Sequence, residues 1–438
     1  MPSQDTARSA PVLSTTPRRD WSSGAVSDRL NAIGMLLKSL IIKNLLSFGP
    51  GTELVPLGPL NVLIGPNGSG KSNFLEAISL LQAAPRDLSG PVKEVGGVRD
   101  WLWKGEATAV ASLEVMVENP RRKMPLRHLM KFTEHGGRFE LVEERIENEQ
   151  AFPGKNGPYF FYRFQNGYPV LKETSTKRAQ GTAPQNQEEE EQDSDLDREL
   201  KRETLNPEQS ILSQFKDPER YPVLAYLDSA YSRIALYREW TFGRYTPPRQ
   251  EQKADLRTDS LMTTCENLAL VLNKIRPKVR QRLLEALKAL YPEIQDFNVQ
   301  VEAGRVQLFL EEGSYSIPAT RLSDGTLRYL CLLAVLCHPE PPPLVCIEEP
   351  ELGLHPDVLP ELSRLLVEAS ERTQLIVTTH SDILVDTMTE RPESVLVCEK
   401  HDGETKIRRL KKEDLTVWLD KYRLGQLWTM GQIGGTRW

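Results

Sequence analysis

The feature that most constrains this chain is a glycine-rich segment, Gly65-Pro-Asn-Gly-Ser-Gly-Lys-Ser72, which matches the phosphate-binding loop pattern GxxxxGK[ST]. It follows the apolar run 60–64 and precedes the apolar stretch 73–81, so a strand, a loop and a helix are predicted in the order that the motif requires. The glycines allow successive backbone N–H groups to face a phosphate, and the start of the helix directs partial positive charge at the same anion. The chain is therefore expected to bind a nucleoside triphosphate.

The loop residues have separate expected roles. The Lys71 ammonium is expected to reach the β- and γ-phosphates, and the Ser72 hydroxyl to hold Mg²⁺. ATP and Mg²⁺ are thus the expected cofactors. The segment predicted to surround ATP consists of Gly65, Pro66, Asn67, Gly68, Ser69, Gly70, Lys71, Ser72 and Asn73.

Composition places the chain among ordinary globular proteins. It has 438 residues, of which 39% are hydrophobic and 26% charged, enough for two or three domains. No apolar run approaches the roughly 18–20 residues that span a bilayer, and the N-terminus lacks an apolar signal core. The five cysteines show no CxxC spacing and mostly lie in apolar runs, as buried cysteines do in a reducing compartment. We expect a cytoplasmic protein with no membrane partner.

The charge distribution does not by itself indicate a nucleic-acid binder. The net charge is −6, but the segment 187–197 alone holds seven acids, so the rest of the chain is nearly neutral. The basic stretches 121–123 and 276–282 could contact phosphates or could simply be solvated surface. Both interpretations stay open at this point.

The expected fold class is α/β, a nucleotide-binding lobe with a mixed sheet and flanking helices, split by a mainly helical insertion in which Pro277 separates two helices. The N-terminal extension is polar and aperiodic, so disorder is expected there, and Met35 is an alternative start. The predicted segments are a disordered extension (1–34), the N-terminal half of the lobe (35–170), an acidic flexible loop (171–216), a helical insertion (217–295), the C-terminal half of the lobe (296–400) and a C-terminal segment (401–438).

Two further strand ends carry candidate catalytic groups. The apolar run 344–347 ends in Glu348-Glu349-Pro350-Glu351, the Walker B arrangement of a buried strand that delivers carboxylates beside a phosphate loop. Glu348 is the expected Mg²⁺ ligand, although Asp is more usual there, and Glu349 is the expected general base. His380 follows the apolar run 375–379 and is expected to contact the γ-phosphate or the attacking water.

A third element precedes these carboxylates. Leu322-Ser-Asp-Gly-Thr326 leads into the apolar stretch 329–336, and Ser323 is the expected N-cap of a helix. The helix amides behind Ser323 could bind an anion, although a capped helix explains the pattern equally well.

Together with the segments 42–48, 96–102, 349–356 and 378–381, these motifs resemble the ABC-type ATPases, and among them the RecF/SMC-like branch and its compact relatives described as predicted AAA-family ATPases. The chain lacks sustained heptads, so long coiled-coil arms are excluded.

The resemblance implies additional roles. In this family a signature segment, here Ser323, Asp324 and Gly325, completes the ATP site of a second protomer, which implies an ATP-dependent homodimer. His355 takes the D-loop position, and Lys43 with Asn44 match a segment near the ribose and phosphates. The Q-loop stays open between Gln82 and the loop 96–99.

Two functions are compatible with these features. The first is an ATP-hydrolysing dimeric switch that acts on DNA or on a DNA-processing partner, in DNA repair or anti-phage defence. The alternative is a nucleotide-gated scaffold or sensor that recruits a separate effector or nuclease protein without binding nucleic acid. A transporter subunit is disfavoured by the insertion and by Asp324 within the signature.

Overall fold

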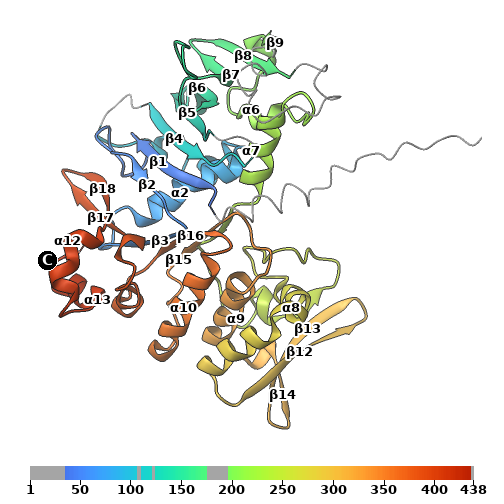
Figure 1. Cartoon of the computed structure of the whole chain (residues 1–438). Coiled ribbons are helices and arrows are strands. Elements are labelled where there is room, and N and C mark those ends of the chain that lie inside the picture. The colour runs from blue at the N-terminus through green and yellow to red at the C-terminus, as the bar shows by residue number, and fades with distance from the viewer. Residues whose placement is uncertain (1–34, 106–109, 121–123, 175–195, 436–438) are drawn as a thin grey trace, which may run out of the picture.

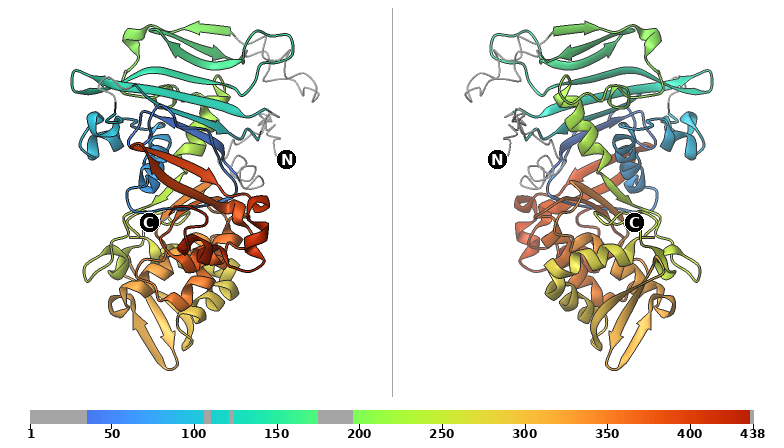
Figure 2. Two further views of the ribbon diagram at one scale, coloured as in Figure 1. Left: turned by 90° about the vertical axis from the view of Figure 1, so that its left-hand side faces the viewer. Right: turned by 90° about the vertical axis from the view of Figure 1, so that its right-hand side faces the viewer.

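The computed structural model describes residues 35–105, 110–120, 124–174 and 196–435. The predicted disorder of residues 1–34, most of the acidic loop and the basic stretch 121–123 lie outside these ranges. A central, largely parallel sheet has a larger antiparallel sheet above it and a layer of helices below it (Figures 1 and 2). No helix in these ranges is both long and apolar enough to span a membrane.

The central sheet carries the functional residues. Its strand order is β10 (Ala235–Tyr237), β15 (Leu344–Glu348), β16 (Gln374–Thr378), β3 (Leu60–Ile64), β17 (Val395–His401) and β18 (Glu404–Arg409). The first five strands run parallel and β18 is antiparallel to β17. Every residue of β3 and β16 is buried, as expected for parallel strands that are covered on both faces.

Alternate residues of β3 pack into two separate cores. Leu60, Val62 and Ile64 join the core formed with the lower helices, whereas Leu63 joins the core beneath the antiparallel sheet. This period of two is what a strand imposes on its side chains. The lower helices are α8 (Leu268–Leu290), α9 (Asp324–Leu336) and α10 (Leu359–Ala369); the helices under the antiparallel sheet are α2 (Lys71–Ala83) and α7 (Pro222–Ser232).

The antiparallel sheet has eight strands and is joined to the central sheet by a buried glutamine. Gln374 of β16 accepts hydrogen bonds from the backbone N–H groups of Leu36 (3.1 Å) and Leu37 (2.8 Å), and donates to the carbonyls of Leu37 (2.7 Å) and Gly58 (3.0 Å). The order is β2 (Val55–Pro56), β1 (Leu37–Lys43), β4 (Ala111–Val117), β5 (Leu126–His135), β6 (Arg138–Asn148), β7 (Phe160–Gln165), β8 (Tyr168–Glu173) and β9 (Leu196–Glu199).

A small sheet packs against α8 at the opposite end of the molecule (Figure 1). It contains β11 (Gln252–Lys253), β13 (Arg305–Glu312), β12 (Ile294–Glu302) and β14 (Tyr315–Pro318). The remaining helices are α3 (Gly90–Glu94), α4 (Val98–Trp101), α6 (Ile211–Gln214), α11 (Asp382–Asp386), α12 (Lys412–Leu419) and α13 (Leu424–Thr429), with short 3-10 turns η2 (Arg202–Thr204), η3 (Pro247–Arg249), η4 (Ala319–Arg321), η5 (Pro356–Val358) and η6 (Pro392–Ser394).

Several predicted segment boundaries differ from the structure. The range 217–295 is not a separate helical lobe, because β10 within it is a strand of the central sheet. The range 401–438 likewise includes β18 of that sheet, and 296–400 opens with β12–β14, which lie outside it. The described flanks of the acidic loop 171–216 are ordered as the β8–β9 pair and α6.

These errors have a local cause. A strand as short as β10, with three residues, shows no readable period of two. In contrast, the predicted break at Pro277 is confirmed, because α8 consists of two helical stretches that meet at a kink, where Val279 has a non-helical φ of −131°.

Candidate nucleotide-binding and hydrolysis site

The phosphate-binding loop connects β3 to α2 as the sequence predicts. Gly70, at the start of α2, has a φ of 100°, and a Cβ atom there would lie 2.2 Å from Thr405 Oγ1, so only glycine fits. The buried Lys71 donates from its ammonium to the carbonyls of Gly65 (2.8 Å) and Pro66 (3.0 Å). The lysine therefore lies against the loop whose bound phosphates it is expected to contact.

Two polar residues that the sequence analysis missed support this loop. Thr405, in β18, donates to the Ser69 carbonyl (3.0 Å) and hydrogen-bonds the Ser47 hydroxyl (2.7 Å). Ser47 also accepts a hydrogen bond from the Asn73 side chain (2.7 Å). Segments that are far apart in the sequence thus hold the loop in place. The sequence alone does not show that Ser47 and Thr405 lie together in the fold.

Lys43 and Asn44, which are predicted to lie near the ribose and phosphates, come shortly before Ser47 in the sequence. Lys43 is exposed at the end of β1, and Asn44 has a left-handed backbone (φ 52°) with its side-chain amide donating to the Val110 carbonyl (3.3 Å). A contact of either residue with nucleotide stays a prediction.

The predicted metal residues are adjacent. Glu348 ends β15, and the parallel register of β15, β16 and β3 brings their carboxyl ends to one edge of the sheet. There the Ser72 hydroxyl donates to Glu348 Oε1. A hydroxyl beside a carboxylate fits Mg²⁺, which takes oxygen ligands and uses few carboxylates when nucleotide phosphates supply the rest. Bound Mg²⁺ would neutralise charge on the β- and γ-phosphates.

Arg238, directly after β10, is a further residue of the site that the sequence motifs did not reveal. Its Nε donates to Glu348 Oε2 (3.1 Å) and its terminal nitrogen to Glu76 Oε1 of α2 (3.0 Å). Burial alone would lower the pKa of Arg238, but the two carboxylates outweigh it and raise the pKa above its ordinary value. The arginine is therefore a fixed cation against the metal-side carboxylate.

The two Q-loop candidates lie elsewhere. The Gln82 side chain donates to the Ile234 carbonyl (2.6 Å), and Arg99 of the 96–99 loop pairs with Glu134 (3.2 Å). Neither residue has a described hydrogen bond or ion pair to the phosphate loop or to Glu348. The segment that approaches Glu348 is the one after β10, which the sequence analysis did not consider.

The predicted base and switch residues face each other. Glu349 has a left-handed backbone (φ 45°), and its N–H donates to the Thr378 carbonyl (3.1 Å). Its Oε1 lies 3.6 Å from His380 Nε2, and the Glu349 and His380 side chains are 35% and 33% exposed. Water can reach both groups, as hydrolysis requires.

Glu351 supports this pair from beneath. Its Oε1 accepts hydrogen bonds from the Thr379 hydroxyl (2.7 Å) and the His380 backbone N–H (2.8 Å). Burial raises the pKa of Glu351, and these two hydrogen bonds partly offset the effect. Glu351 therefore fixes the backbone from which the His380 side chain projects.

The predicted signature forms the N-terminus of α9. Ser323 is exposed and caps the helix by accepting from the Thr326 N–H (3.0 Å). Gly325 packs against the loop after Glu349, since a Cβ atom there would lie 2.7 Å from the Gly353 carbonyl oxygen. Asp324 pairs with Arg249 within the same chain.

His355 in the predicted D-loop position caps η5, accepting from the Asp357 N–H (3.3 Å), and its side chain is 71% exposed. Participation of Ser323, Asp324, Gly325 and His355 in a partner's ATP site stays a prediction.

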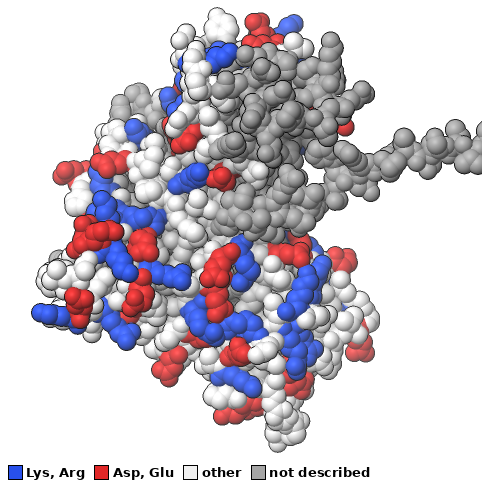
Figure 3. Space-filling model, viewed as in Figure 1, with Lys and Arg blue, Asp and Glu red and all other residues white. Residues whose placement is uncertain are grey.

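The basic stretch 276–282 is occupied by internal ion pairs. On the face shown in Figure 3, basic and acidic side chains are interspersed. The pairs are Arg276–Asp296 (2.6 Å), Arg280–Asp296 (2.6 Å), Lys278–Glu340 (2.6 Å), Arg282–Glu361 (2.8 Å) and Arg282–Glu368 (2.7 Å). This geometry favours the solvated-surface interpretation of the stretch over phosphate contacts.

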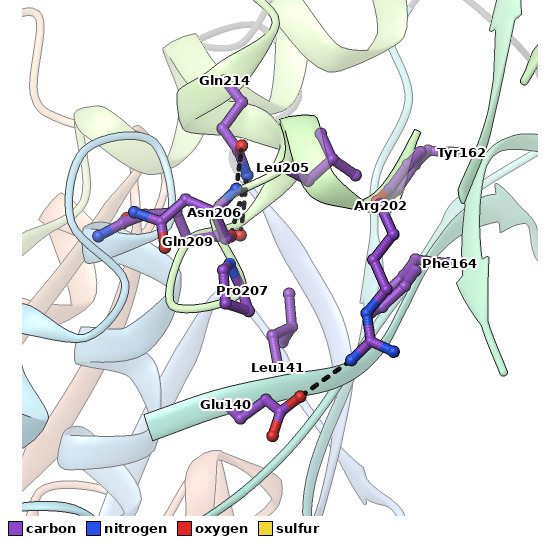
Figure 4. Close-up of a pocket in the computed structure, with 10 residues that line it drawn as sticks. All are labelled: Glu140, Leu141, Tyr162, Phe164, Arg202, Leu205, Asn206, Pro207, Gln209 and Gln214. Carbon is purple, nitrogen blue, oxygen red and sulfur yellow. Dashed lines mark hydrogen bonds and ion pairs between the residues drawn. The ribbon is translucent and has the colours of Figure 1, made fainter. Parts of the chain in front are cut away.

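Two pockets lie outside the phosphate loop. One of about 580 Å³ is lined by Glu76, Gln82 and Arg238 among others. A smaller one, about 100 Å³, lies in the antiparallel sheet between Tyr162, Phe164 and the segment 202–214, with an Arg202–Glu140 ion pair (3.1 Å) at its edge (Figure 4). The smaller pocket is well below the roughly 300 Å³ of typical ligand sites.

The fold is similar to that of solved Smc heads, and a sequence-family profile identifies the family of the chain. The chain belongs to the family described as "AAA domain, putative AbiEii toxin, Type IV TA system", whose sequence profile matches residues 60–117 and 163–386. The resemblance to ABC-type ATPases and the predicted α/β fold class are thereby confirmed.

One known protein matches part of this sequence. Over 102 residues the chain is 29% identical to the chromosome partition protein Smc of Clostridium kluyveri (strain NBRC 12016); this match covers 22% of the chain and only 8% of that protein's length.

Two solved Smc heads share the fold at 16% identity. One, an Smc head bound to the C-winged helix domain of ScpA, gives a TM-score of 0.51 over 86% of this chain and 99% of that one. The other is an Smc head with an extended coiled coil bound to the C-terminal domain of ScpA derived from Pyrococcus furiosus, with a TM-score of 0.52 over 88% and 98%.

Proposed function

We propose that this protein hydrolyses ATP with Mg²⁺ and uses the cycle as a dimerisation switch. The observation that carries this is the convergence of Ser72, Glu348, Glu349 and His380 at one edge of the sheet, next to the loop that holds Lys71. Phosphoryl transfer needs phosphate binding, charge neutralisation and an oriented water, and these residues can supply all three.

Each residue has a distinct task in the proposed reaction. The loop amides and Lys71 bind the phosphates, and Ser72 with Glu348 holds Mg²⁺. Glu349 accepts the proton of the attacking water, while His380, 3.6 Å from the carboxylate, orients that water or donates to the γ-phosphate. Glu351 keeps His380 in place through the backbone.

The position of the signature supports the proposed dimer. Ser323 is exposed at the start of α9, so its hydroxyl and the helix N-terminus are accessible to a nucleotide held by a second protomer. Ser323 and Gly325 would then complete the partner's site, and ATP would act as the bridge between the two chains.

For the biological task we propose action on DNA or on a DNA-processing partner, in repair or anti-phage defence. Similarity to a chromosome partition protein and a family description that includes a toxin system support this direction. Basic side chains of the stretch 276–282 already form ion pairs with acidic residues of the same chain. This favours the second candidate, a nucleotide-gated scaffold that recruits an effector or nuclease protein. The ScpA-bound Smc heads show that related folds dock proteins.

The steady-state ATPase rate, measured with and without linear duplex DNA at low and moderate salt, tests these alternatives. Stimulation that fades with salt supports action on DNA. A rate indifferent to DNA supports the scaffold. Absence of ATP turnover under all conditions, with nucleotide bound, would refute the hydrolytic switch itself.

A further inference from the structure

The register of two neighbouring strands places a cation beside the metal-side carboxylate. β10 and β15 are parallel, with Tyr237 paired to Ile347, so the next residues along each strand are Arg238 and Glu348. Both follow the sheet to the same edge. The contact between them is therefore set by strand pairing rather than by a chance surface encounter.

Four side chains at this edge are linked by three successive contacts. Ser72 donates to Glu348 Oε1, Arg238 donates to Glu348 Oε2 (3.1 Å) and Arg238 also donates to Glu76 (3.0 Å). Ser72 and Glu76 lie four residues apart on α2, on one face of that helix. The side chains of Arg238, Glu348 and Glu76 are only 26%, 17% and 18% exposed, so solvent screens these pairs little.

This arrangement fixes the orientation of the Glu348 carboxylate. A glutamate in place of the usual aspartate has one more rotatable bond, so its carboxylate could point away from the metal. Arg238 holds Oε2 and leaves Oε1 directed at Ser72, where Mg²⁺ is expected. Because a guanidinium has only donors, Arg238 itself cannot coordinate the ion.

We propose that Arg238 is a positioning residue, which orients Glu348 for Mg²⁺ by bridging it to Glu76. The inference rests on the proposed function, since it concerns the metal of the same ATP site. A planar guanidinium can serve two carboxylates with different nitrogens, whereas a lysine ammonium is a single point charge. Orientation, and not charge alone, is the contribution of Arg238.

The test measures binding of a fluorescent ATP analogue to the full chain while Mg²⁺ is titrated, with a parallel series in EDTA. In Arg238→Gln the Mg²⁺ concentration for half-maximal binding should rise roughly 10-fold or more, as for other groups that orient metal ligands. Binding in EDTA should stay unchanged. Arg280→Gln, which leaves Asp296 paired with Arg276, is the matched control and should behave as the parent.

Two further variants separate orientation from charge. Arg238→Lys keeps the charge and should still raise the Mg²⁺ requirement, because the bridge to Glu76 is lost. In a Glu348→Gln background, Arg238→Gln should cause no additional change. An unchanged or lower Mg²⁺ requirement in Arg238→Gln, or parental behaviour of Arg238→Lys, would overturn the positioning role while leaving the ATPase proposal intact. Nucleotide binding by the parent protein that is no tighter with Mg²⁺ than in EDTA would overturn both.

Discussion

Replacing Glu349 with glutamine tests the proposed chemistry most directly. Glutamine has nearly the same shape and tolerates the same backbone, so the fold should be retained. The described hydrogen bonds and ion pairs of Glu349 are with Thr378, Arg328, Leu352 and His380. None of these residues belongs to the phosphate loop. We therefore expect Glu349→Gln to bind Mg²⁺ and ATP with parental affinity and to lose turnover.

The size of the loss can be bounded. A general base contributes about 10²- to 10⁴-fold to a rate, which corresponds to about 2.7–5.5 kcal/mol in the barrier. His380 stays in place in this variant, 3.6 Å from the substituted side chain, and can still orient water. The expected loss in kcat is thus nearer the lower bound, about 100-fold.

The assay combines phosphate release under steady-state conditions with equilibrium binding of a fluorescent ATP analogue. Glu390→Gln, an exposed residue on the turn after α11, is the matched control and should keep the parental rate. Light scattering after size exclusion should show that Glu349→Gln accumulates dimer with ATP. Turnover at the parental rate would refute the assignment of the base, and loss of binding together with turnover would show that Glu349 acts by shaping the site.

Four further outcomes are expected. Lys71→Ala should weaken ATP binding about 10- to 100-fold, from the roughly 1.5–3 kcal/mol of a charged hydrogen bond; unchanged binding in a titration would contradict the loop assignment. Gly325→Ala should clash with the Gly353 carbonyl and reduce the ATP-dependent dimer seen by light scattering, while ATP binding to one chain persists. Gln374→Leu removes the acceptor of the buried Leu36 and Leu37 N–H groups and should cost about 3 kcal/mol of unfolding free energy by urea denaturation; a loss under about 1 kcal/mol would mean that water replaces the side chain. Burial raises the pKa of Glu351 in the folded protein above its ordinary 4.5, so the charged carboxylate destabilises the fold at pH values above the folded-state pKa. The unfolding free energy of the parent, measured relative to that of Glu351→Gln, should therefore rise as the pH falls through the folded-state pKa.

Sequence patterns predicted the parts of the site that lie within single motifs. The glycine loop, the carboxylates after β15 and the histidine after β16 each follow a buried apolar run, and parallel pairing then forces them to one edge. Arg238 and Thr405 could not be found this way. Arg238 follows a strand that pairs with the distant β15, whereas Thr405 lies in a local hairpin with β17 and reaches the loop only because β17 pairs with the distant β3. Neither residue lies in a recognisable motif.

The same limit applies to domain boundaries. The sheet combines strands from three distant parts of the chain (60–64, 235–237 and 344–409), whereas composition reports only on continuous stretches. The basic stretch 276–282 stayed open for a related reason, because charge along the sequence says nothing about the carboxylates of Asp296 and Glu361 that the fold brings to it.

The strand order of the central sheet also governs when the site can form during synthesis. Within the described residues β3, which leads into the phosphate loop, pairs with β16 and β17. Leu60 therefore meets its partner Leu375, and Val62 meets its partner Val395, only late in translation. Until then a strand whose residues are all buried in the native fold has no sheet to join, and closing so long a loop is entropically costly. A ribosome-bound fragment that ends before β16 should therefore neither bind nucleotide nor resist proteolysis at β3, and the nascent N-terminal half should depend on chaperones until the last strands emerge.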